Sequence, residues 1–200
     1  MLVRYFLICL VFLLSGFEKP MSEYEWTVMR SSKLAVNGST NVNKFKCDVS
    51  EYVPIDTIGC HKMYLKEKGY TMYGGLKIDV TGFNCHNPMM TADLRKTLKA
   101  KEHPKLFVRF LNIARLPELK QHAEQIPGWA EIEIAGVIKR MDMMYSVSSP
   151  NSDLVILKGK RQVLFSDFDI KPPTRLGGIV RVNNELDVEF TLHLKPFSKG

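Results

Sequence analysis

The clearest regularity in this chain is the alternation of apolar and polar side chains, which is strongest near its C-terminal end. The apolar positions of that segment are separated from one another by single polar residues: Leu186, Val188, Phe190, Leu192 and Leu194. Successive side chains of a β-strand point to opposite faces of a sheet, so the pattern predicts a strand with one apolar and one wet face.

The same alternation predicts further strands in the segments 26–36, 41–49, 76–80, 106–113, 130–134, 141–147 and 155–165. Turn-forming residues lie between these segments, at Asn37-Gly38, Gly74-Gly75, Ala135-Gly136, Ser149-Pro150-Asn151 and Asn183-Asn184. We therefore expect an all-β fold in which about eight antiparallel strands close into a barrel, the size that can hold one small ligand.

One short helix interrupts the strand pattern, beginning at Pro88 or Thr91 and ending near Lys101. Proline is tolerated in the first turn of a helix, and Leu94 and Leu98 lie four residues apart and share one face. We expect this face to pack over one opening of the barrel. Residues 116–128 contain two prolines and are expected to form a long loop at a barrel rim.

The first residues resemble a secretory signal peptide, with Arg4 followed by an apolar run from Tyr5 to Leu14. That run is too short to span a bilayer, although an uncleaved anchor remains an alternative. We expect a signal peptide over residues 1–16, a single barrel domain over residues 22–200, and export to the periplasm or the medium. Loss of Arg4 lowers the formal net charge from +7 to +6.

The basic residues are scattered in small groups, of which Lys158, Lys160 and Arg161 are one example. Such groups usually form solvated faces, but loose attraction to anionic lipid headgroups is the functional alternative. A nucleic-acid partner is not expected for an exported protein. The sequence leaves homo-oligomerisation open.

Export would leave three cysteines, Cys47, Cys60 and Cys85, in an oxidising compartment. Cys47 and Cys85 each end an extended segment, so we expect a disulfide between them near one rim. Cys60 is then a buried thiol, or it is the disulfide partner of one of the others. Cys60 and His61 are too few ligands for a zinc site, and no metal is expected.

The sequence contains none of the local motifs of serine hydrolases, zinc proteases, phosphate-binding loops or Cys-X-X-Cys redox proteins. Neither catalysis nor a cofactor is therefore expected. The most site-like polar cluster is His86-Asn87 beside Cys85. Asn84 and Asn87 are interpreted as helix caps, with a ligand headgroup at this turn as the alternative.

Several segments together resemble the YceI-like family. They are Phe83–Met90, the helical residues Thr91–Ala100, and His103–Phe107, with Gly38–Cys47 upstream and Gly136–Lys139 downstream. The resemblance extends over Trp26–Pro196 and implies an exported lipocalin-like barrel, without enzymatic activity, that holds an isoprenoid or another long apolar lipid.

The apolar faces of the predicted strands supply candidate lumen residues for such a ligand. They are Leu34, Val36, Val42, Leu76, Ile78, Phe83, Phe107, Phe110, Ile132, Ile134, Val188, Phe190 and Leu192. A solidly filled core would explain these residues equally well, and it is the resemblance that favours a ligand. The alternative function is a packed structural or interaction module that contacts a membrane surface or a protein.

Overall fold

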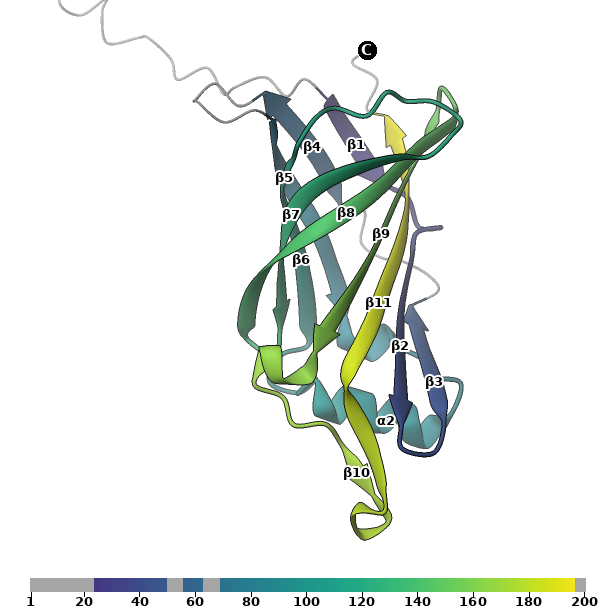
Figure 1. Cartoon of the computed structure of the whole chain (residues 1–200), viewed down its shortest axis with the longest axis vertical. Coiled ribbons are helices and arrows are strands. Elements are labelled where there is room, and N and C mark those ends of the chain that lie inside the picture. The colour runs from purple at the N-terminus through teal and green to yellow at the C-terminus, as the bar shows by residue number, and fades with distance from the viewer. Residues whose placement is uncertain (1–23, 50–55, 63–68, 197–200) are drawn as a thin grey trace, which may run out of the picture.

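The alternating segments form antiparallel strands that close into a barrel (Figure 1). The wall follows the order β1 (Tyr24–Val28), β4 (Thr57–Lys62), β5 (Tyr70–Asp79), β6 (Lys105–Ile113), β7 (Glu124–Ile134), β8 (Val137–Asn151), β9 (Leu154–Leu164) and β11 (Val180–Pro196). Pairing of β11 with both β9 and β1 completes the circle. The predicted eight-stranded antiparallel barrel is thus confirmed. This computed structural model describes residues 24–49, 56–62 and 69–196, and the predicted signal peptide lies outside them.

The predicted strand 26–36 is wrong as a single element, because the chain breaks it into β1 and β2 (Lys33–Thr40). Both pieces lie along the same edge of β11, one after the other. Between them a tight turn forms, in which the Ser32 N–H donates to the Met29 carbonyl and the Ser32 hydroxyl accepts from the His193 N–H. β2 then forms a hairpin with β3 (Lys44–Val49).

Only one of the predicted turns lies where the sequence placed it. Ala135 and Gly136 adopt positive φ angles of 50° and 82° and join β7 to β8. Three others lie inside strands, at Asn37-Gly38 in β2, Gly74-Gly75 in β5 and Asn183-Asn184 in β11. The last two fall at register shifts, where turn-forming residues bend a strand without ending it.

Two further boundaries differ from the predictions. Residues 149–151 still belong to β8, and the turn follows at residues 152–153. The predicted rim loop ends early, because residues 124–128 already pair with β8 as the start of β7.

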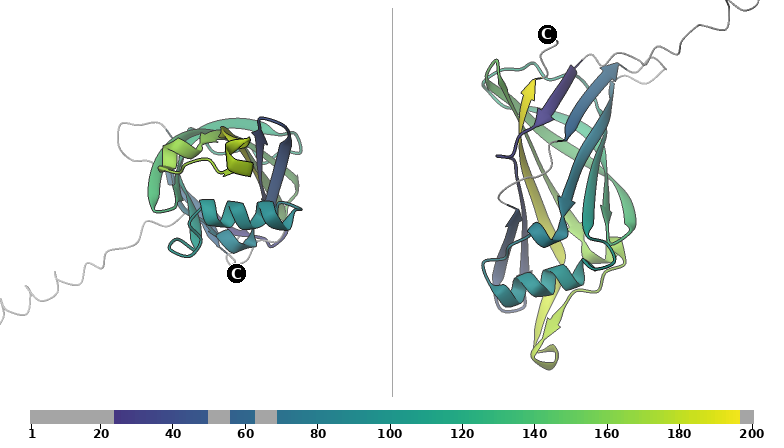
Figure 2. Two further views of the ribbon diagram at one scale, coloured as in Figure 1. Left: turned by 90° about the horizontal axis from the view of Figure 1, so that it is seen from below. Right: turned by 180° about the vertical axis from the view of Figure 1, so that it is seen from behind.

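Helix α2 (Pro88–Thr97) crosses one end of the barrel, called the helix end below (Figure 2). The Asn87 side chain caps it by accepting from the Met90 N–H at 3.1 Å, which confirms the capping role expected for Asn87. Leu94 and Leu98 are buried against the barrel. The helix ends before the predicted Lys101, because Lys99 adopts a left-handed φ of 54°. None of the described helices is long and apolar enough to cross a membrane.

Aromatic side chains fill the middle of the barrel. Phe110, Tyr145 and Phe190 come from three different strands, and their ring centroids lie 5.9–6.5 Å apart. Gly159 pairs with both Tyr145 and Phe190 across its neighbouring strands, so it leaves room for the two rings. This part of the lumen is a packed core.

Candidate functional site

A cavity of about 260 Å³ opens at the helix end of the barrel. Three elements surround it: α2, the β2–β3 hairpin, and the segment 171–182, which we call the arm. The arm contains β10 (Thr174–Arg175) and a short 3₁₀ turn (Leu176–Gly178), and it returns along the start of β11. Figure 2 shows α2 and the arm on opposite sides of the barrel opening.

The cavity lining is mostly apolar, and all three elements contribute to it. The apolar lining residues are Val42, Phe45, Met89, Met90, Leu94, Phe165, Pro173, Val180 and Val182. Several polar side chains in the lining bond to one another or to the backbone. The Thr40 hydroxyl bonds to the Asn43 side chain at 2.8 Å, and Asn87 caps the helix. The lining therefore offers chiefly apolar contact to an occupant.

An ion pair links two walls of the cavity. Arg175 on the arm uses Nε and Nη2 to bond both carboxylate oxygens of Asp93 on α2. Two parallel bonds of this kind fix the geometry of a pair as well as its distance. The pair therefore holds the arm against the helix at the cavity mouth.

The Cys47–Cys85 disulfide was predicted from the sequence and is confirmed by the structure. It attaches the β2–β3 hairpin, which is the third wall of the cavity, to the segment just before α2. Cys47 lies on β3 and lines the cavity, and Cys85 lies shortly before α2. Beside it, the backbones of Asp48 and Asn84 exchange hydrogen bonds of 2.9 and 3.0 Å. The helix that covers the opening is therefore fastened to the edge of β3, which has no strand partner on that side among the described residues.

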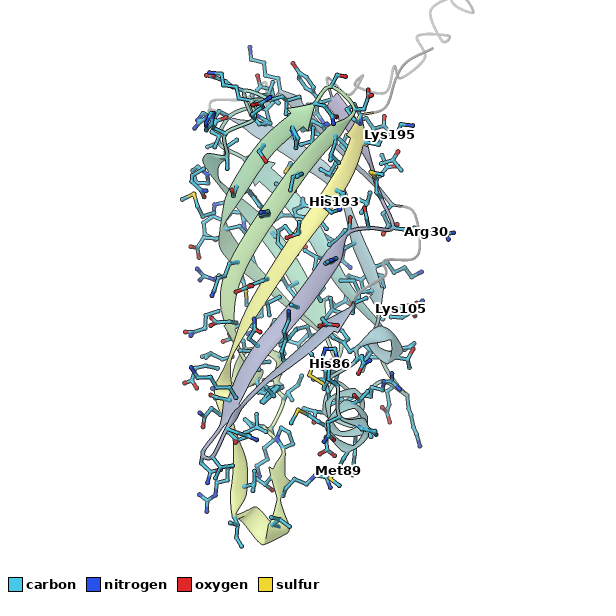
Figure 3. The ribbon with its side chains drawn as sticks, turned by 90° about the vertical axis from the view of Figure 1, so that its right-hand side faces the viewer. Arg30, His86, Met89, Lys105, His193 and Lys195 are labelled. Carbon is cyan, nitrogen blue, oxygen red and sulfur yellow. A yellow bond between two sulfur atoms is a disulfide. The ribbon has the colours of Figure 1, made fainter. Side chains whose placement is uncertain are left out.

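The polar cluster at residues 84–87 helps to attach α2 to β3. The His86 ring lies 3.1 Å from the Asp48 carboxylate, and the Asn84 side chain accepts from the His86 N–H. Figure 3 shows His86 and Met89 beside α2 at the helix end. These contacts give the cluster a structural role in placing the helix.

Beyond the aromatic cluster the barrel has little free space. A second cavity, bounded by Trp26, Ile58 and Tyr145 among others, measures only about 30 Å³. That is the volume of roughly one water molecule in the liquid. Of the two, only the helix-end cavity has room for a substantial part of a ligand.

Most of the predicted lumen residues do face the interior, but as part of the packed core. Leu34, Val36, Leu76, Ile78, Phe83, Phe110, Ile132, Phe190 and Leu192 are buried, and Ile134 and Val188 are partly buried against them. None of these residues lines the helix-end cavity. Whether any of them contacts a ligand stays a prediction.

Two of the predicted lumen residues lie outside the packed core: Phe107 faces outward on β6, and Val42 lies at the cavity mouth. Phe107 and Phe110 lie three residues apart on β6, so one strand cannot present both to the same side. Phe110 takes the inner side, and the Arg109 guanidinium lies 5.7 Å from the centroid of the Phe107 ring on the outside. Val42 is 67 % exposed at the tip of the β2–β3 hairpin, although it also lines the cavity mouth.

Most of the cavity lining was not predicted from the sequence. Phe165, Val180 and Val182 come from segments that carried no ligand prediction, and in the segment 41–49 the prediction named Val42 and not Phe45. For Val180 and Val182 a signal was present, because they keep the two-residue spacing of the apolar positions around Leu186, although Asn184 interrupts the series. Leu94 was expected to pack on the opening, and it does so while also lining the cavity.

The basic group on β9 carries largely compensated charge. Lys160 lies 3.0 Å from Glu189 and 3.8 Å from Asp187, and Arg161 lies 2.9 Å from Asp142. The hydrogen bond to Glu189, followed by the charges of Asp187 and Glu189, raises the pKa of Lys160. These residues form a mixed-charge face of the barrel wall.

Comparison with solved structures identifies this architecture. BcnA from Burkholderia cenocepacia superimposes with a TM-score of 0.60 at 16 % identity, over 81 % of this chain and 95 % of that one. The CJ YCEI protein superimposes with a TM-score of 0.52 at 12 % identity, over 71 % of this chain and 82 % of that one. This chain has the YceI fold.

A third protein with the YceI fold is a polyisoprenoid binding domain from Saccharophagus degradans, implicated in plant cell wall breakdown. It matches with a TM-score of 0.61 at 12 % identity, over 88 % of this chain and 99 % of that one. No family model matches the sequence, and no curated protein is similar to it at the sequence level. The resemblance drawn from the sequence is thus confirmed at the level of the YceI fold.

Proposed function

We propose that this chain is an exported YceI-like protein that binds an isoprenoid or another long apolar lipid without catalysis. The observation that carries the proposal is the apolar cavity enclosed by α2, the β2–β3 hairpin and the arm. The name of the Saccharophagus degradans domain with the same fold supports a polyisoprenoid as ligand. The disulfide supports export, since such bonds persist in oxidising compartments.

The cavity takes one end of the lipid. Its volume of about 260 Å³ lies just below the range of roughly 300–1,000 Å³ that is usual for small-molecule pockets. The aromatic cluster of Phe110, Tyr145 and Phe190 fills the barrel interior. Each methylene that enters gains about 0.8 kcal/mol from its removal from water, so a short apolar stretch suffices for binding.

The test is native mass spectrometry of the purified protein, followed by solvent extraction and identification of any released compound. Val182→Trp places a large side chain in the cavity from a partly buried position on β11. We expect this variant to lose the co-purified lipid and to bind added farnesol at least tenfold more weakly. Val137→Trp is the matched control, because Val137 is also partly buried but does not line the cavity.

The packed middle of the barrel favours a second candidate, an interaction module without a ligand. A protein that carries no lipid and does not bind added farnesol would support this candidate. If Val182→Trp and Val137→Trp both lose farnesol binding to the same extent, that result would also contradict binding at the helix-end cavity.

A further inference from the structure

Large apolar side chains stand exposed around the mouth of the cavity. The exposed fractions are 67 % for Val42, 62 % for Met89, 73 % for Leu176 and 71 % for Ile179. In the described part of the chain, every other large hydrophobic side chain is less exposed than these. We call these four residues the apolar rim.

The rim comes from three elements that are tied together. Val42 is at the tip of the β2–β3 hairpin, Met89 is in the first turn of α2, and Leu176 and Ile179 are at the tip of the arm. The Asn41 side chain donates to the Ile179 carbonyl at 2.9 Å, which joins the hairpin to the arm. Figure 3 shows that Met89 and the arm project at the same end of the molecule.

Basic residues lie on two of the segments that carry the rim. Lys44, Lys46, Lys171 and Arg181 are exposed on the hairpin and the arm. The stretches 38–46 and 170–184, which contain both tips, include no acidic residue. Asp93 on α2 is a carboxylate of this end, and it is engaged by Arg175. The hairpin tip and the arm tip therefore carry basic residues and no carboxylate of their own, while Asp169 and Glu185 flank the arm.

Apolar tips that also carry basic residues match the interface of an anionic bilayer. Apolar side chains enter the boundary between headgroups and acyl chains, while lysine and arginine meet the lipid phosphates. A protein partner would need a broad matching surface of roughly 800 Å². The rim consists of separate projecting tips around the cavity mouth. This shape fits a deformable lipid bilayer better than it fits a broad protein surface.

We propose that the apolar rim docks this protein on an anionic lipid bilayer. Val42 and Met89 belong to both the rim and the cavity lining, so docking places the cavity mouth against the lipids. That docking serves to bring the cavity to its lipid ligand rests on the proposed lipid-binding function. The docking itself does not require a bound ligand.

Vesicle co-sedimentation of the purified protein tests the proposal. The probes are vesicles of phosphatidylcholine alone and vesicles of equal parts phosphatidylcholine and phosphatidylglycerol. We expect binding to the anionic vesicles that weakens as salt is added. The double variant Leu176→Ser/Ile179→Ser is expected to bind at least tenfold more weakly. Lys44→Glu/Lys171→Glu is expected to lose at least as much, since each cation near such a surface contributes about a fivefold factor.

Matched controls separate the rim from the rest of the surface. Leu119→Ser/Met144→Ser removes two exposed apolar side chains away from the rim, which are 43 % and 52 % exposed. Lys158→Glu/Lys195→Glu reverses two charges on the barrel wall and at its opposite end (Figure 3). Both control proteins are expected to bind the vesicles as the unaltered protein does.

Several results would overturn the proposal. They are failure of the unaltered protein to bind anionic vesicles, equal losses in rim and control variants, and rim-dependent self-association in sedimentation equilibrium. The lipid content of the same preparations, measured separately, distinguishes this failure from failure of the proposed ligand binding. A protein that carries a bound lipid but does not bind vesicles would refute the docking proposal and leave the proposed ligand binding intact.

Discussion

Gly159 lies directly opposite Phe190 across the β9–β11 pair, and a methyl group at residue 159 would stand 2.3 Å from Phe190 Cζ. The ring cannot move away freely, because Phe110 and Tyr145 pack against it. The absence of a side chain at this position therefore permits the aromatic packing that fills the barrel.

Gly159→Ala is accordingly expected to destabilise the protein by about 1–3 kcal/mol, the usual cost of overpacking a core. Urea unfolding followed by tryptophan fluorescence measures the change. Gly82→Ala serves as the control, because its new methyl group would meet only ordinary contacts at 3.9 Å or more. Equal stability of the two variants would show that the ring packing tolerates the extra methyl group.

Removal of the disulfide is expected to weaken both the fold and the cavity. The bond closes a loop with a sequence separation of 38, which corresponds to roughly 4 kcal/mol in the chain-entropy account. Cys47→Ser and Cys85→Ser should lower the free energy of unfolding to the same extent. They should also loosen α2, because Cys85 is attached just ahead of the helix.

Adding a reductant provides the control for this prediction. The reductant should destabilise the unaltered protein and leave the Cys47→Ser/Cys85→Ser protein unchanged. Peptide mapping that linked Cys60 to either residue in the unaltered protein would contradict the pairing.

The ion pair between Arg175 and Asp93 is expected to slow the release of a bound lipid more than it stabilises the fold. Their side chains are 45 % and 28 % exposed, and pairs of this kind contribute about 0.2–1 kcal/mol to stability. Arg175→Ala should therefore change the free energy of unfolding little and accelerate the dissociation of a fluorescent isoprenoid severalfold.

The pair formed by Arg161 and Asp142 is a suitable comparison, since it is also partly exposed but lies on the barrel wall. Arg161→Ala should leave the dissociation rate unchanged. If both arginine variants release the probe equally fast, the contact between arm and helix does not govern release.

Tyr145 makes stability depend on alkaline pH. Burial raises the pKa of Tyr145 above its ordinary value of 10.0. Above pH 10.0 the unfolded chain loses this proton while the folded protein retains it, so the free energy of unfolding falls as pH rises. The slope from this one group is at most about 1.4 kcal/mol per pH unit.

Tyr145→Phe isolates that contribution. The hydroxyl makes only a long hydrogen bond of 3.4 Å to the Trp129 carbonyl, so the substitution should cost little at neutral pH. Above pH 10.0 the stability of the variant should decline less steeply than that of the unaltered protein. Parallel curves throughout the alkaline range would show that Tyr145 ionises as readily in the folded state.

The sequence predicted the features that depend on local periodicity. Alternation around Phe190 identified the strand and its inner face, and the polar Asn87 followed by Pro88 identified the start of the helix. Phe107 was misplaced because residues 106–108 are all apolar, and a run without polar residues does not reveal which side faces inward. The cavity was missed for a different reason. An apolar face looks the same in sequence whether it packs solidly or borders a space, and only the spatial placement of α2 and the arm leaves the space open.

The closure of the barrel between β1 and β11 has a consequence for biosynthesis. Trp26 pairs with Pro196, so the wall cannot be completed until nearly all of the described chain has been made. Pairings this distant in sequence are associated with slow folding, commonly in milliseconds to seconds. Val180 and Val182, which line the cavity, belong to that same last described strand. A growing chain therefore has no finished cavity before β11 is made, and a lipid can fill that cavity only after this strand has joined the wall.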